Sequence, residues 1–251
     1  MRKLVAALNV RNNSKRLYAK PLQNLSDEIT VLDQIINTIK KFRKIDEIII
    51  GIADGSENLS YIDFCNKRNI KFITGSEIDV LERLIKCGVE SKATDIFRVT
   101  TECPFIWMDN FDKIWKNHVE NNNDITVTDN LPEGTALEIY KLESLKFIHR
   151  NCETKYRSEI FSRYPRNNTK EFKVKVIEPP KILQRIDIRL TIDYPEDLVM
   201  CREIYNKFKN EIPNVNISKI INYLDKNDEV KQLVKKRINH TQTLIWQNYK
   251  N

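Results

Sequence analysis

The first hundred residues alternate between short apolar runs, rich in β-branched residues, and longer stretches with apolar residues at helical spacing. The short runs are typical of buried strands and occupy Leu4–Val10, Glu47–Ala53, Lys71–Gly75 and Asp95–Thr100. The helical stretches between them occupy Val31–Phe42, Glu57–Asn69 and Glu77–Ser91. Chains that alternate in this way form parallel strands joined by crossover helices. The alternation therefore predicts an α/β fold, a Rossmann-like, mostly parallel sheet with helices on both faces.

The second half of the chain departs from this alternation. Its strand-like segments are Ile125–Asp129, Thr135–Leu142, Phe172–Glu178 and Ile188–Asp193. Its helical segments are Glu143–Asn151, Lys155–Tyr164, Pro195–Lys209 and two short polar helices within Ile217–Ile238. The few Gly and Pro residues mark no linker. We therefore expect one domain over residues 1–251, with an α+β insertion at roughly 130–187 and C-terminal helices at 212–251.

Composition argues against several classes of protein. No apolar run approaches the roughly 20 residues of a membrane span, and the N-terminus enters a strand without a signal-peptide pattern. The five cysteines form no C-x-x-C pair, which favours reduced thiols in a cytoplasmic protein over a zinc site or disulfides. The net charge of +7 permits an anionic partner, but Lys and Arg are spread along the chain. The aromatic residues fall within apolar patterns rather than among the cations. We therefore expect neither a nucleic acid nor a membrane as partner.

The loop after the first predicted strand concentrates positive charge. Residues 9–22 (NVRNNSKRLYAKPL) hold no acid and four cations, Arg11, Lys15, Arg16 and Lys20. Cations and backbone amides between a strand and a helix suit a polyphosphate. The loop contains neither the G-x-x-x-x-G-K-[ST] nor the G-x-G-x-x-G pattern. On charge alone, a solvated basic turn explains the loop equally well.

Three segments are expected to meet at one edge of the sheet. Open parallel sheets bind ligands at the carboxyl ends of their strands, where the strand order switches. The basic loop, Thr100–Pro104 (TTECP) and Asp193 each follow a predicted strand. Glu102 and Asp193 are therefore candidates for holding Mg²⁺ or Mn²⁺ beside a triphosphate. Each could equally be a surface acid or a helix cap, and Asp193 precedes a capping pattern, Tyr-Pro-Glu-Asp.

Five strings, in order along residues 4 to about 208, resemble a known enzyme family. The loop reads A-x-x-x-R-x-x-S-K-R-L-x-x-K from Ala7 to Lys20. The other strings are GSEIDVLERL (Gly75–Leu84), RVTTECPFI (Arg98–Ile106), GTALEIY (Gly134–Tyr140) and IRLTIDYPEDL (Ile188–Leu198). Together they are similar to the sugar-acid cytidylyltransferases, including the CMP-sialate and CMP-ketodeoxyoctulosonate synthetases, and most closely to the SpsF-like branch. The resemblance implies a nucleotide-diphospho-sugar transferase-like fold and a homodimer built through the insertion.

The resemblance also implies a reaction. An acceptor oxygen attacks the α-phosphorus of CTP, and pyrophosphate leaves. Lys20, Arg16 and Arg11 would be the catalytic cations, with Lys20 neutralising the pyrophosphate, and Glu102 and Asp193 would position the metal. The residues expected to bind CTP are Leu8, Asn9, Arg11, Ser14, Lys15, Arg16, Lys20, Asp79, Arg98 and Thr100, of which Asp79, Arg98 and the backbone near Leu8 would shape the cytidine pocket. Such transfers depend on positioning and on stabilising developing charge, so no histidine is required, and His118, His149 and His240 lie outside the strings.

Three departures from the family pattern concern the site. Tyr18-Ala19 stands where the family has Pro-Gly, and Glu102 replaces the usual metal aspartate. Ile160 follows Glu159 where the SpsF-like branch has a Glu-His pair. This last change lies in the acceptor region and indicates an acceptor other than the usual one for that branch.

The residues expected to bind the acceptor are Glu138, Arg157, Glu159 and Arg189. Cations in the insertion together with Glu138 suit an acceptor with a phosphate and an amino-acid-like end. The altered motifs resemble the cytidylyltransferases of capsular phosphoramidate biosynthesis. The predicted acceptor is therefore L-glutamine phosphate, giving CDP-L-glutamine for capsular polysaccharide modification. The alternatives are a nonulosonic sugar acid, glycerol phosphate or a phosphonate as acceptor, or a nucleotide-binding protein without turnover.

Overall fold

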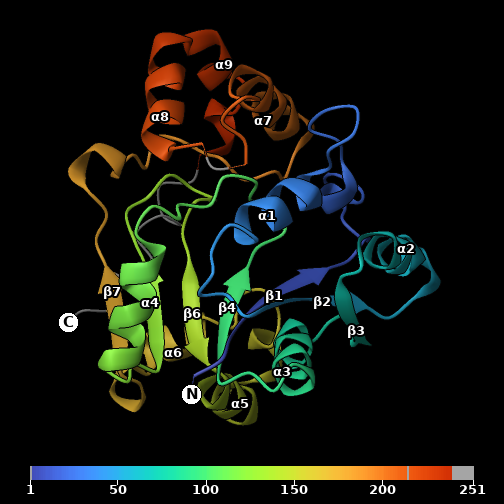
Figure 1. The fold of residues 1–251 in the computed structure, drawn as a ribbon, viewed down its shortest axis with the longest axis vertical. Coiled ribbons are helices and arrows are strands. Elements are labelled where there is room, and N and C mark those ends of the chain that lie inside the picture. Colours follow the sequence, from blue (N-terminus) through green and yellow to red (C-terminus); the bar gives the residue numbers. More distant parts are fainter. Residues whose placement is uncertain (1, 214, 239–251) are drawn as a thin grey trace.

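A seven-stranded sheet forms the centre of the computed structural model, which describes residues 2–213 and 215–238 (Figure 1). The strand order is β3-β2-β1-β4-β6-β5-β7. β6 runs antiparallel to β4 and β5, and the other neighbouring pairs are parallel. The predicted mostly parallel, Rossmann-like fold is therefore confirmed. The strands are β1 (Leu4–Val10), β2 (Glu47–Ala53), β3 (Lys71–Gly75), β4 (Asp95–Val99), β5 (Ile125–Thr128), β6 (Glu138–Lys141) and β7 (Val174–Ile177).

The sheet divides the hydrophobic core in two, and β1 shows how. Leu4 and Leu8 belong to one buried cluster, while Val5 and Ala7 belong to the other, because successive side chains of a strand point to opposite faces. Two helices contribute to the second cluster, α3 (Val80–Glu90) and α5 (Leu142–Asn151). Those that contribute to the first are α1 (Val31–Ile39), α2 (Leu59–Arg68), α4 (Phe111–Glu120), α7 (Pro195–Lys207), α8 (Ile217–Lys226) and α9 (Asp228–Gln232).

Local sequence signals set where the helices begin. In α1, Thr30 Oγ1 accepts a hydrogen bond from the amide of Asp33 at 3.1 Å, and Asp33 Oδ2 accepts one from the amide of Thr30 at 3.0 Å. Asp79 Oδ1 accepts from the amide of Glu82 at the start of α3, at 2.8 Å. These bonds satisfy amides that have no partner inside the helix.

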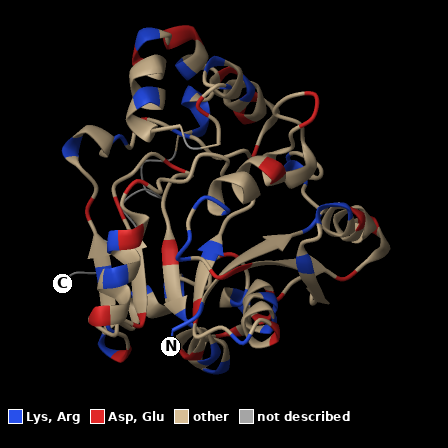
Figure 2. Ribbon diagram, viewed as in Figure 1, with Lys and Arg blue, Asp and Glu red and all other residues tan. Residues whose placement is uncertain are grey.

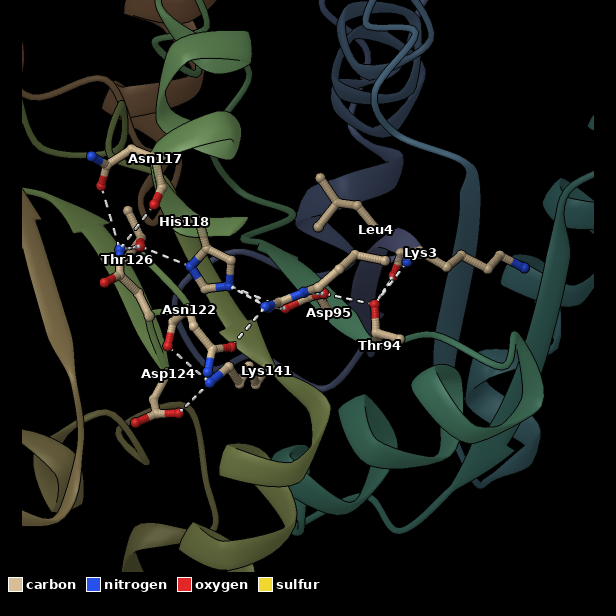
Figure 3. Close-up of polar contacts among 12 residues, drawn as sticks. Lys3, Leu4, Thr94, Asp95, Asn117, His118, Asn122, Asp124, Thr126 and Lys141 are labelled. Carbon is tan, nitrogen blue, oxygen red and sulfur yellow. Dashed lines mark hydrogen bonds and ion pairs between the residues drawn. The ribbon is translucent and has the colours of Figure 1, made fainter. Parts of the chain in front are cut away.

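A buried polar network joins β4, β5 and α4 at the amino end of β4, away from the carboxyl ends of the strands (Figure 3). His118 Nε2 lies 3.1 Å from Asp95 Oδ1, and His118 Nδ1 lies 2.8 Å from Thr126 Oγ1. Arg2 Nε also donates to Asp95, at 2.7 Å. Burial would raise the pKa of Asp95, but the hydrogen bonds from His118 and Arg2 lower it. His118 therefore links α4 to β4 and β5 at the amino end of β4.

Two predicted elements are wrong. Lys155–Tyr164 is not a helix: a 3-10 turn covers Thr154–Tyr156, and helix resumes only in α6 (Arg163–Asn167). The carbonyl of Arg157 instead accepts the amide of Leu81 at 3.0 Å, which takes that oxygen away from a local helix. Ile188–Asp193 is an extended loop with one isolated bridge, between Glu133 and Arg189.

The segment at 130–187 contributes β6 and β7 to the central sheet. Of the C-terminal segment expected at 212–251, α8 and α9 lie within the described residues, whereas residues 239–251, with His240, lie outside them. No helix in the described part of the chain is both long enough and apolar enough to span a membrane.

Candidate active site

A crevice of about 430 Å³ lies at the carboxyl ends of β1 and β4. The chain runs from β1 outward through β2 and β3, then returns to β4 on the other side of β1, so the strand order switches at this point. Eleven of the residues predicted to form the site line the crevice: Asn9, Arg11, Ser14, Lys15, Arg16, Lys20, Arg98, Thr100, Glu102, Glu159 and Asp193. The expected convergence of three segments is therefore present.

Lys20 is the most deeply placed cation of the loop. It lies in the 3-10 turn Lys20–Leu22, and the residue is 6 % exposed. Its Nζ donates to Asp193 Oδ1 at 2.7 Å and lies 3.8 Å from Glu102 Oε1. A buried ammonium needs such partners, because removing it from water is costly. Lys20 thus joins the two carboxylates that sequence analysis singled out.

Asp193 is held by three cations. Besides Lys20, Arg16 Nη2 donates to Oδ1 at 2.7 Å and Arg189 Nη2 donates to Oδ2 at 2.7 Å. Burial alone would raise the pKa of Asp193, but Lys20, then Arg189 and Arg16, lower it below its usual range. Asp193 is not the cap of α7, since Asp197 Oδ2 accepts the amides of both Asp193 and Tyr194, at 2.8 and 2.9 Å.

Glu102 has a weaker set of partners. Burial raises its pKa, and although Lys20 opposes this, the nearby carboxylates of Glu159 and Asp193 raise it further. An added positive charge beside Glu102 would therefore stabilise its ionised form. Among the residues that the structure describes, no group of three or more His, Cys, Asp or Glu could hold a metal ion.

A second cavity, of about 230 Å³, adjoins the first. Both are lined by Arg98, Thr100 and Asp193, and the second is completed by Cys103, Glu133, Gly134, Ala136, Glu138 and Thr191. Arg98 Nη1 donates to Glu138 Oε2 at 2.7 Å, so this pair stands where the cavities meet. Burial would raise the pKa of Glu138, but Arg98 and then Arg166 lower it. Two adjoining cavities suit a reaction between two substrates.

Charges of both signs meet around the crevice. Figure 2 shows a basic position on β4 beside an acidic position on β6, the neighbouring strands that carry Arg98 and Glu138. Arg11 Nη2 pairs with Glu159 Oε1 at 3.0 Å, and Arg98 Nη2 donates to the carbonyl of Glu159 at 3.1 Å. The segment that carries Glu159 is thereby tied to both Arg11 and Arg98.

Four predicted ligands line neither cavity. Leu8 is fully buried in the core, and Asp79 caps α3 and bonds to His149 Nε2 at 2.8 Å. The side chain of Arg157 lines neither cavity. Arg189, which is 4 % exposed, lies behind Asp193 and bridges it to Glu133 and Asp197 at 2.5 and 3.0 Å.

Sequence reasoning missed part of the lining. In the first crevice it missed Asn13, Pro21, Val80, Arg83, Leu84, Val99 and Thr101, and in the second Cys103, Glu133, Gly134, Ala136 and Thr191. Arg83 could have been found, because it falls between Val80 and Leu84 on the apolar stripe of its helix, where a cation is unusual. Burial raises the pKa of the Cys103 thiol to about 12, so it is no thiolate nucleophile at neutral pH.

Comparison with known proteins places most of the chain in one group. The family described as Cytidylyltransferase matches residues 5–240. An uncharacterized protein of Methanocaldococcus jannaschii is 32% identical over 231 residues, which cover 92% of this chain and 94% of that protein. The spore coat polysaccharide biosynthesis protein SpsF of Bacillus subtilis is 27% identical over 235 residues, covering 91% and 97%. A cytidylyltransferase structure from Leptospira borgpetersenii superposes with a TM-score of 0.83 at 21% identity, covering 92% and 98%.

Proposed function

Because the chain belongs to the cytidylyltransferase family, we propose that it joins CMP from CTP to a phosphorylated small-molecule acceptor and releases pyrophosphate. The observation that carries the proposal is the meeting of Lys20 with Asp193 and Glu102, at 2.7 and 3.8 Å, beside the exposed cations of the same loop. Anionic phosphates need cations, and a metal needs carboxylates. Cations and carboxylates are both present at this edge of the sheet.

The residues act by position and charge. Arg11, Lys15 and Arg16 lie on the loop at the crevice and would bind the outer phosphates of CTP. An anionic acceptor oxygen forms a bond to the α-phosphorus while the bond to the pyrophosphate oxygen breaks, and the leaving group takes the electron pair. Lys20 would stabilise the negative charge that develops on that oxygen. The acceptor phosphate is already ionised at neutral pH, so no general base is required.

Glu102 and Asp193 fit a hard divalent cation such as Mg²⁺ or Mn²⁺. Both are carboxylates and both lie against Lys20 Nζ, and burial, together with the carboxylates of Glu159 and Asp193, raises the pKa of Glu102 although Lys20 lowers it. These two side chains would hold the ion, with phosphate oxygens completing its shell. When bound, the ion would supply charge neutralisation at the α-phosphate.

The second cavity is the proposed acceptor site. It presents Glu133 and Glu138 beside Arg98, a mixture that suits an acceptor with an ammonium group and a phosphate better than a sugar acid with only negative charge. L-glutamine phosphate, giving CDP-L-glutamine for capsular polysaccharide modification, has these groups and is the acceptor we propose. We also propose a homodimer and, since the five cysteines are all free and buried, a reducing cytoplasmic environment.

The test is pyrophosphate release from CTP and Mg²⁺ with a panel of acceptors: L-glutamine phosphate, glycerol phosphate, a phosphonate and a nonulosonic acid. L-glutamine phosphate should give the highest rate, and omitting Mg²⁺ should abolish it. Lys20→Ala should remove turnover while keeping the fold, whereas Lys67→Ala, at an exposed position of α2, should not. Absence of pyrophosphate with every acceptor would falsify the enzymatic proposal, and a faster rate with another acceptor would change the substrate.

A further inference from the structure

Tyr194 contacts both the loop after β1 and the 3-10 turn Lys235–Arg237 near the end of the described chain, although it lines neither cavity. It follows Asp193 directly and precedes α7, and its backbone amide donates to Asp197 Oδ2 at 2.9 Å. That bond closes the start of the helix, so the backbone that carries the ring has a fixed place beside the crevice. The position of the ring therefore depends on the same segment that presents Asp193.

Arg16 has two partners on that segment, one of them charged and the other aromatic. Its Nη2 donates to Asp193 Oδ1 at 2.7 Å, and its Cζ lies 5.1 Å from the centre of the Tyr194 ring. At this distance the negative face of an aromatic ring attracts a cation. Burial lowers the pKa of Arg16, but Tyr194 and then Asp193 raise it, so both partners favour the charged guanidinium. The side chain of Arg16 is 47 % exposed and lines the crevice, so it is also open to a ligand.

Arg237 contacts the same ring from the C-terminal part of the chain. Its Cζ lies 3.8 Å from the ring centre, and its Nη2 lies 3.6 Å from Glu196 Oε1 in the first turn of α7. A planar guanidinium stacks on an aromatic face at such a distance. Val234, three residues earlier, is 1 % exposed and belongs to the same buried cluster as the apolar residues of α7. The turn that carries Arg237 is therefore anchored to the body of the protein.

The aromatic partner of Arg16 matters once a metal ion and a nucleotide are bound. Asp193 is a proposed metal ligand, and a divalent ion on its carboxylate would weaken its bond with Arg16. The face of an aromatic ring neither binds such an ion in place of the carboxylate nor adds a negative charge that repels a phosphate. Tyr194 can therefore keep Arg16 at the crevice in a state in which Asp193 no longer does.

We propose that Tyr194 is a positioning residue, which orders Arg16 for the outer phosphates of the nucleotide and is itself held by Arg237; this proposal rests on the proposed use of CTP. The C-terminal turn thereby contributes to a site whose cavities it does not line. Without the ring, Arg16 would have to be ordered by the nucleotide itself, and that loss of side-chain freedom reduces affinity. Binding of the outer phosphates should suffer, whereas binding of a ligand that has only the α-phosphate should not.

Calorimetric titration with CTP and with CMP, each in Mg²⁺, tests the proposal without knowledge of the acceptor. Tyr194→Leu should weaken CTP binding about fivefold, which corresponds to about 1 kcal/mol of cation–π interaction, and should leave CMP binding unchanged. Tyr194→Phe keeps the ring and should bind CTP within about twofold of wild type. Arg237→Met should weaken CTP binding about two- to threefold, whereas Lys236→Met, on the same turn, should not.

A double-mutant cycle shows whether Tyr194 acts through Arg16. In an Arg16→Met background, Tyr194→Leu should change the affinity for CTP by less than about twofold, because the guanidinium that the ring holds is already gone. A residue with a merely structural role would weaken CTP and CMP alike, and would do so in both backgrounds. Either of these results would overturn the proposal, as would a Tyr194→Leu variant that binds CTP like wild type.

The variants of the C-terminal turn provide an independent decision. Should Tyr194→Leu fail to fold by circular dichroism, the comparison of Arg237→Met with Lys236→Met decides the matter, because both variants keep the ring. Equal affinity of these two for CTP would remove the C-terminal turn from the proposal. A CTP-selective loss in Tyr194→Leu, in a protein that releases no pyrophosphate, would instead refute the proposed function and leave the positioning role intact.

Discussion

Gly134 shows how closely the backbone that carries Asp193 is packed. It has φ +89°, and a Cβ there would lie 2.7 Å from Thr191 N and 2.8 Å from Leu190 C. These are backbone atoms, which cannot rotate away. The amide of Leu190 also donates to the carbonyl of Glu133 at 2.7 Å, so the two segments are held together beside the site. Gly134→Ala should therefore push the 188–193 segment outward.

The cost can be worked out from two terms. A left-handed conformation costs a residue with a Cβ about 1–2 kcal/mol, and packing one methyl group too many costs about 1–3 kcal/mol. Alanine has fewer unfolded conformations, which offsets about 0.4–1 kcal/mol. We expect Gly134→Ala to lower the free energy of unfolding by about 1–4.5 kcal/mol, and the middle of that range lowers Tm by about 10 °C in a chain of this size. Turnover should fall as well, since Asp193 moves with the segment.

Gly55→Ala is the matched control. Gly55 also has positive φ, +126°, but the atoms nearest its Cβ belong to the flexible side chain of Glu57. This variant carries the conformational cost without a backbone clash. Urea unfolding of both variants, followed by circular dichroism, measures the difference. If Gly134→Ala is no less stable than Gly55→Ala, the packing argument is wrong.

Three further predictions concern stability and reactivity. Arg185, then Lys231, lower the pKa of Asp187 in the folded protein, so its contribution is complete above the usual aspartate pKa and is lost as pH falls below it; the urea midpoint should therefore fall more between pH 5 and 2 in wild type than in Arg185→Met, in which the other carboxylates with lowered pKa still titrate. Cys103 should resist iodoacetamide at pH 8 until urea unfolds the chain, as peptide mass spectrometry would show, because burial keeps it a thiol. Asp197→Ala should cost about 1–3 kcal/mol in thermal unfolding, more than Asp197→Asn, because it removes the acceptor of Arg189 Nε and of the amides of Asp193 and Tyr194, while Arg189 keeps Glu133 and Asp193.

Elements stabilised by their own sequence could be predicted. The runs at Leu4–Val10 and Glu47–Ala53 are almost entirely apolar, with Asn9 and Glu47 as the polar exceptions, as is typical of strands covered on both faces, and both form strands with those bounds. The cations of the loop after β1 could also be identified from the sequence, because all four lie within one short segment, residues 9–22. Much of the crevice could thus be named from one stretch of sequence.

Elements that depend on distant partners could not be predicted. Lys155–Tyr164 has helical spacing, but the carbonyl of Arg157 bonds to Leu81, some 76 positions earlier in the chain (157 − 81 = 76). Ile188–Asp193 alternates like a strand, but Ile192 donates to the carbonyl of Glu102 in a loop rather than to a neighbouring strand. Arg189 also depends on a distant partner, since Glu133 is brought to it only by the fold, whereas Asp193 and Asp197 are close to it in sequence.

The ion pairs of the crevice have a consequence for how ligands enter. Arg11 faces Glu159, and Arg16 and Lys20 face Asp193, so the cations that would hold a triphosphate already have anionic partners. A nucleotide must compete with these carboxylates, and each one it displaces becomes an unpaired negative charge in a confined space. A divalent ion that arrives with the nucleotide relieves that repulsion. The affinity for either ligand should therefore rise with the concentration of the other, by the same factor in both directions.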